Sequence, residues 1–373
     1  MTAARQPDSP LDEIALQPTR GRGAVSNATG RFEPTRTVAI DDGWDGDDAD
    51  VPPLRTHVTV ETPRRIITTN TSPDIPFTQS INPYRGCEHG CVYCYARPSH
   101  AYMGLSAGLD FESRLFAKPD AARLLDRELR KPGYQPSLIM LGANTDPYQP
   151  LEKKLAITRG ILGVLSAFNH PVVIITKSHL VTRDIDILSS MAERGLVQVA
   201  VSITTLDRHL ANKMEPRAAT PARRLDAIRQ LSAAGIPASV MAAPMIPSLN
   251  DQELERIMEA AADAGAGSAG YILLRLPHEI KDLFAEWLDA HAPMKAKHVM
   301  SLLADMRGGR LYDSAFGTRM RGTGPIADLL ERRYRLAVER LGLKRHVAVE
   351  GRLNTDLFAP PPRPGDQLSL FGA

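Results

Sequence analysis

The stretch INPYRGCEHGCVYCYARPSH, residues 81–100, contains every cysteine of the 373-residue chain. The three thiols, Cys87, Cys91 and Cys94, are spaced as C-x3-C-x2-C. Such a tight cluster does not suit a disulfide framework, and it indicates a dedicated metal or redox site. Three thiolates on one loop can ligate three irons of a [4Fe–4S] cubane and leave the fourth iron without a protein ligand. Tyr93, directly before the last thiol, supplies a flat apolar surface for a molecule bound at that open iron.

Structural zinc is the main alternative for the same thiols, and three incidental thiols are a further one. Zinc would need a fourth ligand, for which His89 and His100 are candidates. The C-x3-C-x2-C spacing differs from that of the common zinc pairs. We therefore favour the iron–sulfur interpretation and regard both histidines as ordinary loop residues.

Downstream of the cysteines, short apolar strands alternate with amphipathic helices. The expected strands cover 137–143, 171–178, 197–204, 237–247 and 269–277. The expected helices cover 152–168, 182–195, 220–235 and 250–265. Gly195 and Gly235 can adopt the left-handed conformation that ends a helix.

Together with the segment that leads into the cysteines, this pattern gives six strand–helix repeats. It predicts an α/β fold with a parallel sheet, a partial (β/α)6 TIM-type barrel whose functional groups lie at the carboxyl ends of the strands. Residues 278–345 show helices and no further convincing strand, and the helix at 325–342 is expected to cap the barrel.

The two ends of the chain differ from this core in composition. Residues 1–60 are rich in Pro, Gly, Ser and Asp, carry 6 Lys/Arg against 10 Asp/Glu, and are expected to form a disordered acidic tail. We divide the remainder into a core at 61–295, a helical extension at 296–358 and a proline-rich tether at 359–373 that holds the last residues away from the body.

The overall composition, 43% hydrophobic and 24% charged, is that of a soluble globular protein. No apolar window suits a membrane span and the first residues lack the apolar region of a secretory signal, so we expect a cytoplasmic protein. Beyond residue 60 the chain has 39 Lys/Arg against 33 Asp/Glu. That excess permits an anionic substrate or nucleic acid without indicating either.

The run CEHGCVYC, 87–94, resembles the signature of the radical S-adenosylmethionine (SAM) superfamily. A resemblance to its spore photoproduct lyase-like, or "DNA repair photolyase", branch extends over 80–280. The segments that carry it are NTDPYQPLE (144–152), TKS (176–178), RDIDIL (183–188) and PMIPSLND (244–251).

The resemblance implies a [4Fe–4S] cluster whose open iron binds SAM. It also implies an electron donor such as flavodoxin or ferredoxin and cleavage of SAM to a 5′-deoxyadenosyl radical that abstracts hydrogen from a substrate.

Several SAM contacts follow from the same resemblance. Tyr93 and Tyr95 match aromatic residues that lie beside SAM. Lys177 ends a strand, where its ammonium could pair with the SAM carboxylate; otherwise it is a solvated lysine at the start of a loop.

Further polar residues are candidates on the same basis. Thr145 and Asp146 could meet the SAM amino group or the substrate, and Ser202 with Thr204 could bond the ribose hydroxyls. Asp146 could instead only initiate a turn, and Ser202 could only satisfy neighbouring backbone. Glu215 is a weaker candidate.

One departure limits the inference about the reaction. The lyase uses an additional cysteine to return hydrogen to its thymine radical, and all three cysteines of this chain are assigned to the cluster. Tyr95, Tyr148 or Tyr271 could replace that donor, and a different reaction is at least as well supported. The general chemistry is therefore better defined than the substrate.

The final residues contain a second motif, QLSLF, which resembles the short peptides that dock on the bacterial replication sliding clamp. It consists of Gln367, Leu368, Ser369, Leu370 and Phe371. Such peptides insert the Leu and Phe side chains into an apolar groove; the alternative is that the apolar residues pack back onto the protein.

The sequence leaves three functions open. The first is a radical SAM enzyme acting on a nucleic-acid base. The second is a clamp-associated adaptor with a structural or redox-sensing cluster. The third is radical-dependent modification of a protein or small metabolite.

Overall fold

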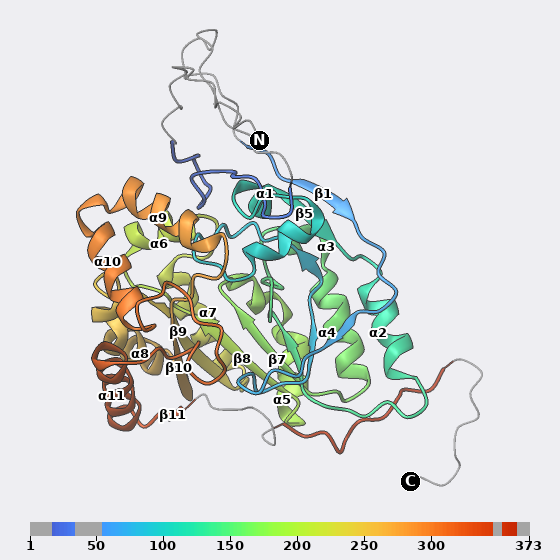
Figure 1. Ribbon diagram of the computed structural model, residues 1–373. Coiled ribbons are helices and arrows are strands. Elements are labelled where there is room, and N and C mark those ends of the chain that lie inside the picture. The colour runs from blue at the N-terminus through green and yellow to red at the C-terminus, as the bar shows by residue number, and fades with distance from the viewer. Residues whose placement is uncertain (1–16, 34–53, 346–352, 364–373) are drawn as a thin grey trace.

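The computed structural model describes residues 17–33, 54–345 and 353–363. Its centre is an eight-stranded sheet in the order β11-β10-β9-β8-β7-β6-β3-β2 (Figure 1). From β3 to β10 every neighbouring pair is parallel. These six strands are β3 (Gln79–Ile81), β6 (Ile139–Leu141), β7 (Val172–Thr176), β8 (Val197–Ser202), β9 (Ala238–Met245) and β10 (Ser268–Leu273). The predicted α/β fold with a partial (β/α)6 barrel is confirmed.

Short strands extend both edges of the parallel sheet. β2 (Ile67–Thr69) pairs antiparallel with β3, and β11 (Lys344–Arg345) pairs parallel with β10. The expectation of no strand after residue 277 is therefore wrong for β11. A second, three-stranded sheet joins β1 (His57–Val60), β5 (Arg114–Ala117) and β4 (Tyr84–Arg85).

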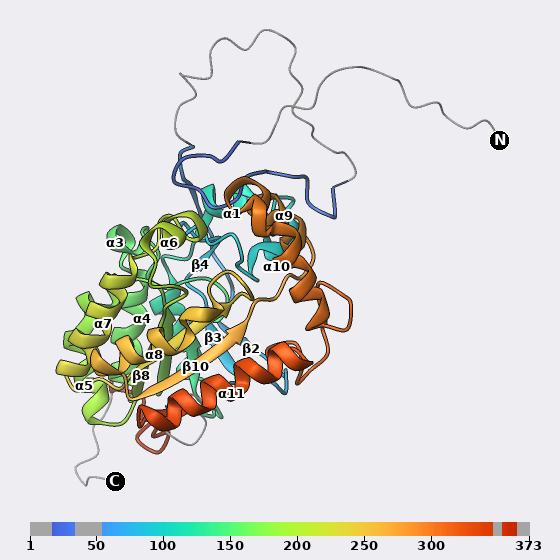
Figure 2. The same cartoon turned by 90° about the vertical axis from the view of Figure 1, so that its left-hand side faces the viewer.

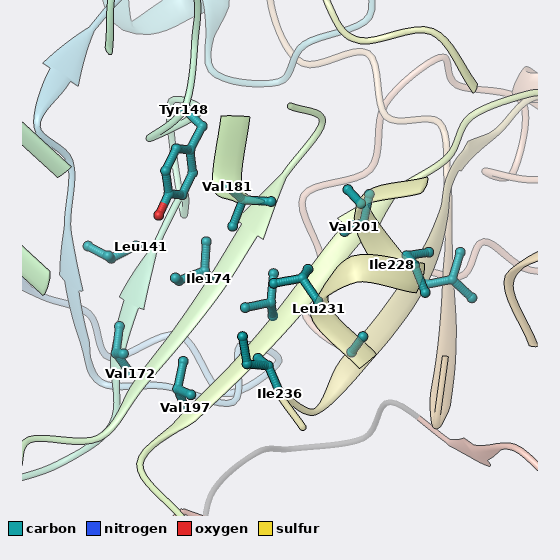
Figure 3. Packing of buried hydrophobic residues seen from close by; sticks show 14 of the residues in the cluster. Leu141, Tyr148, Val172, Ile174, Val181, Val197, Val201, Ile228, Leu231 and Ile236 are labelled. Atoms are coloured by element: carbon teal, nitrogen blue, oxygen red, sulfur yellow. The ribbon is translucent and has the colours of Figure 1, made fainter. Parts of the chain in front are cut away.

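The crossover helices lie on one face of the sheet. They are α2 (Ala121–Leu129), α4 (Ile157–Ala167), α5 (Ile185–Glu193), α7 (Pro221–Ala233) and α8 (Leu254–Asp263). Figure 3 shows aliphatic residues of the strands, such as Val197 and Val201, packed with Ile228 and Leu231 of α7. Each large aliphatic side chain fully buried in this layer contributes about 1.5–3 kcal/mol, so the layer anchors the barrel.

Shorter helices complete the upper part of the fold, at the carboxyl ends of the strands. They are α1 (Leu109–Ser113), α3 (Glu152–Leu155), α6 (Arg208–Met214) and the 3₁₀ segments η2 (Arg97–Met103), η3 (His179–Asp184) and η4 (Asp251–Glu253). The single helix expected at 152–168 is divided at Ala156, which has a φ of +50°. Gly195 and Gly235 have φ values of +68° and +74°, as expected for residues that end helices.

Three helices follow β10, and two of them cover the upper part of the fold near the cysteine loop. α9 (Ile280–His291) and α10 (Pro293–Asp305) pack there, whereas α11 (Pro325–Arg340) runs along β10 (Figure 2). The hydroxyl of Tyr334 on α11 donates to the carbonyl oxygen of Ala269 on β10. The expectation that 325–342 caps the barrel is thus wrong, because its apolar face fills the outer layer beside α8.

Two parts of the expected N-terminal tail are ordered, which corrects the prediction for 1–60. Residues 17–33 lie against the cysteine loop, with Arg22, Ala24 and Val25 buried. Strand β1 pairs with β5 in the smaller sheet. Composition did not reveal this order, because the buried residues are few and their partners are distant in sequence.

The described C-terminal segment, 353–363, lies on the body and is not held away from it. Phe358 packs against Tyr134 and His170, with ring centroids 5.5 and 5.6 Å away. Arg130 Nη1 donates to the carbonyl oxygen of Pro361 over 2.7 Å. The QLSLF motif at 367–371 lies outside the described residues. Across those that are described, no helix has the length and apolar character needed to cross a membrane.

Candidate iron–sulfur site

The three cysteines occupy the loop between β4 and η2. Cys87 and Cys91 are buried, Cys94 is half-buried, and all three are free thiols. The backbone of this loop turns at Gly86, which has a φ of +73°. A Cβ atom at Gly86 would lie 2.5 Å from Leu115 Cδ2, so the position accepts glycine alone without displacement of its neighbours.

A buried arginine fixes the shape of the loop. Arg97 is fully buried, and its Nε donates to the carbonyl oxygen of Cys91 over 2.8 Å. Its Nη1 donates to the carbonyl oxygens of Ala107 and Gly108, and its Nη2 pairs with the fully buried carboxylate of Glu112. Because every nitrogen of the guanidinium has an acceptor, the cation is compensated despite its burial.

The same carboxylate ties the N-terminal segment to the loop. Glu112 accepts the backbone N–H groups of Gly23 and Ala24 over 2.9 and 2.8 Å. A Cβ atom at Gly23 would lie 1.7 Å from the carbonyl oxygen of Gly90 in the cysteine loop. Residues 17–33 therefore form part of the wall around the thiols.

Two side chains of the NTDPYQPLE segment brace the loop from the opposite side. The amide of Gln149, which is fully buried, accepts from the N–H of Glu88 and donates to the carbonyl oxygen of Gly86. Thr145 donates its hydroxyl to the carbonyl oxygen of Tyr84 over 2.8 Å. The hydroxyl proton of Thr145 is therefore already used within the protein, and the contact of Thr145 with SAM stays a prediction.

Asp146 joins three elements through its carboxylate. It accepts from the hydroxyl of Thr176 and the N–H of Lys177, each over 2.7 Å, and lies 3.3 Å from Nδ1 of His89. Burial alone would raise the pKa of this carboxyl, but His89 and the hydrogen bonds outweigh it and hold the pKa at about 2. Both oxygens are thus occupied, so Asp146 links the loop to β7 rather than facing open space.

A second buried network lies beneath Tyr93. Its hydroxyl lies 3.1 Å from Oγ1 of Thr204 and donates to the carboxylate of Glu215. Glu215 forms an ion pair with the fully buried Arg224, and its Oε2 lies 4.0 Å from Sγ of Cys91. Thr204 therefore helps to fix the hydroxyl of Tyr93. Glu215, a weaker candidate in the sequence, lies close to the thiol of Cys91.

Lys177 and Tyr95 face the mouth of the barrel. The ammonium of Lys177 lies 5.7 Å from the centroid of the Tyr93 ring, and within the described part of the chain no hydrogen bond or ion pair is recorded for it. Tyr95 is 45% exposed and donates its hydroxyl to the carbonyl oxygen of Ala143, just beyond β6. The guanidinium of Arg275, just beyond β10, lies 4.8 Å from the centroid of the Tyr95 ring.

Ser202, the remaining sequence candidate, ends β8 and is buried. Its backbone carbonyl oxygen accepts from Nη1 of Arg224 over 3.0 Å. It therefore contacts the network beneath Tyr93 through its backbone. Its predicted contact with a ribose hydroxyl stays a prediction.

The donor set fits a cluster better than a single zinc ion. His89 faces Asp146, and Nε2 of His100 lies 3.0 Å from the carbonyl oxygen of Arg114. Within 17–33, 54–345 and 353–363, no three His, Cys, Asp or Glu side chains converge on a position for one metal ion. A [4Fe–4S] cubane does not require its ligands to converge on one position, because each of the three thiolates ligates a different iron.

Burial dominates the electrostatics of the thiols. It raises the pKa of all three, and it raises that of Cys91 to about 12 with the help of the Glu215 carboxylate. Thiolates are the iron ligands, so loading the site must release protons from these cysteines. Lys177 acts in the opposite direction on Cys91 and Cys94, and its positive charge lowers their pKa.

Comparison with known proteins agrees with this chemistry. Residues 81–261 match the family described as the radical SAM superfamily. The chain belongs to this superfamily. It is a radical SAM enzyme, and its cofactors are the [4Fe–4S] cluster and SAM that this superfamily uses. Cys87, Cys91 and Cys94 are the residues that would hold the cluster.

Relatives of this radical SAM enzyme occur in bacteria and archaea. An uncharacterized protein of Mycobacterium tuberculosis is 37% identical over 227 residues, which are 60% of this chain and 67% of the relative. An uncharacterized protein of Methanocaldococcus jannaschii is 30% identical over 173 residues, 46% of this chain and 62% of the relative.

Solved structures of spore photoproduct lyase share the fold. A structure of a lyase mutant has a TM-score of 0.55 and 16% identity, with 77% of this chain and 80% of the lyase covered. Another lyase structure contains AdoMet and dinucleoside spore photoproduct. At this identity the likeness concerns the fold, so the substrate of this enzyme has to be argued from its own residues.

Proposed function

We propose that this enzyme cleaves SAM reductively and abstracts hydrogen from a base of a nucleic acid, in DNA repair or base modification. The observation that carries the proposal is the ammonium of Lys177, which lies over the Tyr93 ring beside the three thiols without a recorded partner in the described chain. When bound, the cluster and SAM supply a 5′-deoxyadenosyl radical.

The protein's own part is to bind and orient SAM. Lys177, which is partly buried, would pair with the SAM carboxylate, and a hydrogen bond between charged groups contributes about 1.5–3 kcal/mol. The Tyr93 ring would support the ligand from below, because Glu215 and Thr204 hold its hydroxyl. The Tyr95 side chain would form the edge of the site between the ends of β6 and β10.

Among the tyrosines considered as hydrogen donors, Tyr95 is the best candidate. Tyr148 is fully buried in the main core, with its hydroxyl 3.0 Å from Asp184. Tyr271 donates to Glu331 on α11, outside the barrel. Tyr95 instead follows Cys94 directly and is half-exposed at the barrel mouth. Of the three tyrosines, Tyr95 is therefore the one whose phenolic O–H lies at the barrel mouth, where we propose that the reaction occurs.

The test is anaerobic reconstitution followed by reduction. We expect SAM to change the spectrum of the cluster, and 5′-deoxyadenosine to form in the wild type but not in Cys94→Ala. DNA or RNA labelled with deuterium should transfer label to 5′-deoxyadenosine. Well-loaded protein that shows neither the spectral change nor 5′-deoxyadenosine would refute SAM cleavage.

The other two functions give different results in the same experiments. A clamp-associated adaptor would keep its function in Lys177→Ala and lose it when 367–371 are deleted. Modification of a protein or metabolite would transfer label from those fractions of a cell extract and not from nucleic acid.

We also propose that QLSLF docks on the replication sliding clamp. The sequence supports it through the spacing of Gln367, Leu370 and Phe371 after a proline-rich segment. Full-length protein should bind purified clamp, and Leu370→Ala with Phe371→Ala should abolish that binding. Equal binding by the double variant would contradict the proposal.

A further inference from the structure

We propose that the rim of the barrel mouth next to β10 binds single-stranded nucleic acid, with a phosphodiester in a basic pocket and a neighbouring base on an exposed aromatic pair. The inference deepens the proposed function and rests on it, since it names the form of the nucleic-acid substrate and the surface that receives it.

The pocket has a cavity volume of about 350 Å³. It is lined by Leu276, His278, Lys281, Arg310, Leu311 and Tyr312. Within the described residues, no hydrogen bond or ion pair is recorded for the side chains of Lys281 and Arg310. Two cations without a close partner in a concave site attract a phosphate group, even though the Asp313 carboxylate partly offsets the charge of Arg310. The leucines and the tyrosine offer apolar surface for the attached sugar.

The loop that supplies Arg310 to the pocket is predominantly basic. Residues 306–321 contain four arginines and one aspartate. Arg319 is neutralised by Asp74, its ion-pair partner at 2.8 Å, and Arg307 donates to backbone carbonyl oxygens. Arg310 is thus the arginine of this loop that combines exposure with a place in the pocket.

Leu276 and Arg275 connect the pocket to the candidate iron–sulfur site. Leu276 lines the pocket and belongs to the same buried cluster as Cys91 and Tyr93. The preceding residue, Arg275, lies over the ring of Tyr95 at the barrel mouth. A nucleic acid held by the pocket would therefore direct a neighbouring nucleotide toward the mouth, where the reaction would occur.

An aromatic pair is linked to the same segment through Arg31 and Glu279. The rings of Phe32 and Tyr102 have centroids 5.2 Å apart and are 56% and 74% exposed. Arg31 lies 4.7 and 5.3 Å from the two centroids and is held by both oxygens of Glu279. Glu279 lies between the pocket residues His278 and Lys281 in the chain, so the pair and the pocket adjoin.

Exposed aromatic rings interleaved with arginines are typical of single-strand binding surfaces. Unpaired bases stack on such rings, while cations follow the phosphates. A duplex would keep its bases inside and could not use Phe32 and Tyr102. A free phosphorylated metabolite would use the pocket without the aromatic pair. The combination therefore favours a single strand.

The experiment measures binding of a fluorescein-labelled single-stranded oligonucleotide to the full-length, cluster-loaded enzyme across a salt series. Lys281→Ala and Arg310→Ala should each weaken binding and lower the salt slope by about 0.7. Tyr102→Ala should weaken binding at least about fivefold through lost stacking and leave the slope unchanged. Lys297→Ala, which removes an exposed charge on α10, is the matched control.

Three outcomes would overturn the site. The first is wild-type protein that does not bind the oligonucleotide; the second is pocket variants that bind as Lys297→Ala does. The third is a duplex, or inorganic phosphate, that binds as tightly as the single strand. The SAM-dependent change of the cluster spectrum and the formation of 5′-deoxyadenosine are measured separately, without added DNA. The absence of both refutes the proposed function, whereas their presence without oligonucleotide binding refutes this site alone.

Discussion

Replacing Glu112 by Gln tests whether the buried brace holds the cysteine loop. The substitution keeps the size of the side chain but removes the charge that compensates the fully buried Arg97. Breaking a buried ion pair from one side costs about 3–5 kcal/mol, because the remaining charge is left without compensation in a poorly polarisable surrounding. The amide also offers one acceptor oxygen where the carboxylate offers two, so one of the N–H groups of Gly23 and Ala24 loses its acceptor.

We therefore expect Glu112→Gln to lower the free energy of unfolding by about 4 kcal/mol. The measurement is urea denaturation of the reduced protein under anaerobic conditions. Protease cleavage within 17–33 should also become faster, because the segment loses its anchor. In an Arg97→Met background the same substitution should cost far less, since no buried cation remains to be compensated.

Asp120→Asn is the matched control, because it breaks an exposed carboxylate–arginine pair and should leave stability unchanged. A loss below about 1 kcal/mol for Glu112→Gln, or an equal loss in the Arg97→Met background, would refute the role assigned to this pair.

Three further predictions concern the site and the base of the barrel. Lys177→Ala should weaken SAM binding about tenfold to 100-fold in equilibrium titrations, while the exposed Lys154→Ala leaves it unchanged. Gly86→Ala should lower iron content and stability more than Gly133→Ala. Both glycines have positive φ, but only at Gly86 would a Cβ atom meet neighbouring atoms. That contact should add about 1–3 kcal/mol to the loss of stability. Burial lowers the pKa of His170 from 6.5 to about 4. Between these two pH values the folded state binds fewer protons than the unfolded state. The free energy of unfolding should therefore fall by about 3 kcal/mol as the pH drops from 6.5 to 4. Urea midpoints at several pH values should show a smaller slope for His170→Gln.

The repeating part of the fold could be predicted because it depends on local pattern. Continuous apolar runs such as PVVIITKS became buried parallel strands, and the glycines after the helices adopted positive φ. The cysteine spacing likewise indicated its chemistry, since the ligands of a loop-bound cluster are close in sequence. Lys177 became a candidate through the resemblance of TKS to the lyase-like branch, and its contact with SAM stays a prediction.

The supporting residues could not be predicted, because their partners are far apart in sequence. Arg97 reads as an ordinary loop arginine until Glu112 and the carbonyl oxygens at 107–108 surround it. Residues 17–33 have a disordered composition, and only the contact between Gly23 and the cysteine loop reveals why they are ordered. A polar residue at a strand end can either contact a ligand or brace a loop, and sequence alone does not distinguish the two.

Thr145 and Asp146 illustrate that distinction and explain how the site is built. A loop that holds three thiols cannot also supply its own apolar core, so its shape must come from neighbouring segments. Glu112, Gln149 and Glu215 each reach the loop from a different part of the chain, and each is buried. The positions of the thiols therefore depend on the barrel around the loop, and loss of any one brace should reduce cluster loading even though none of the three is a ligand.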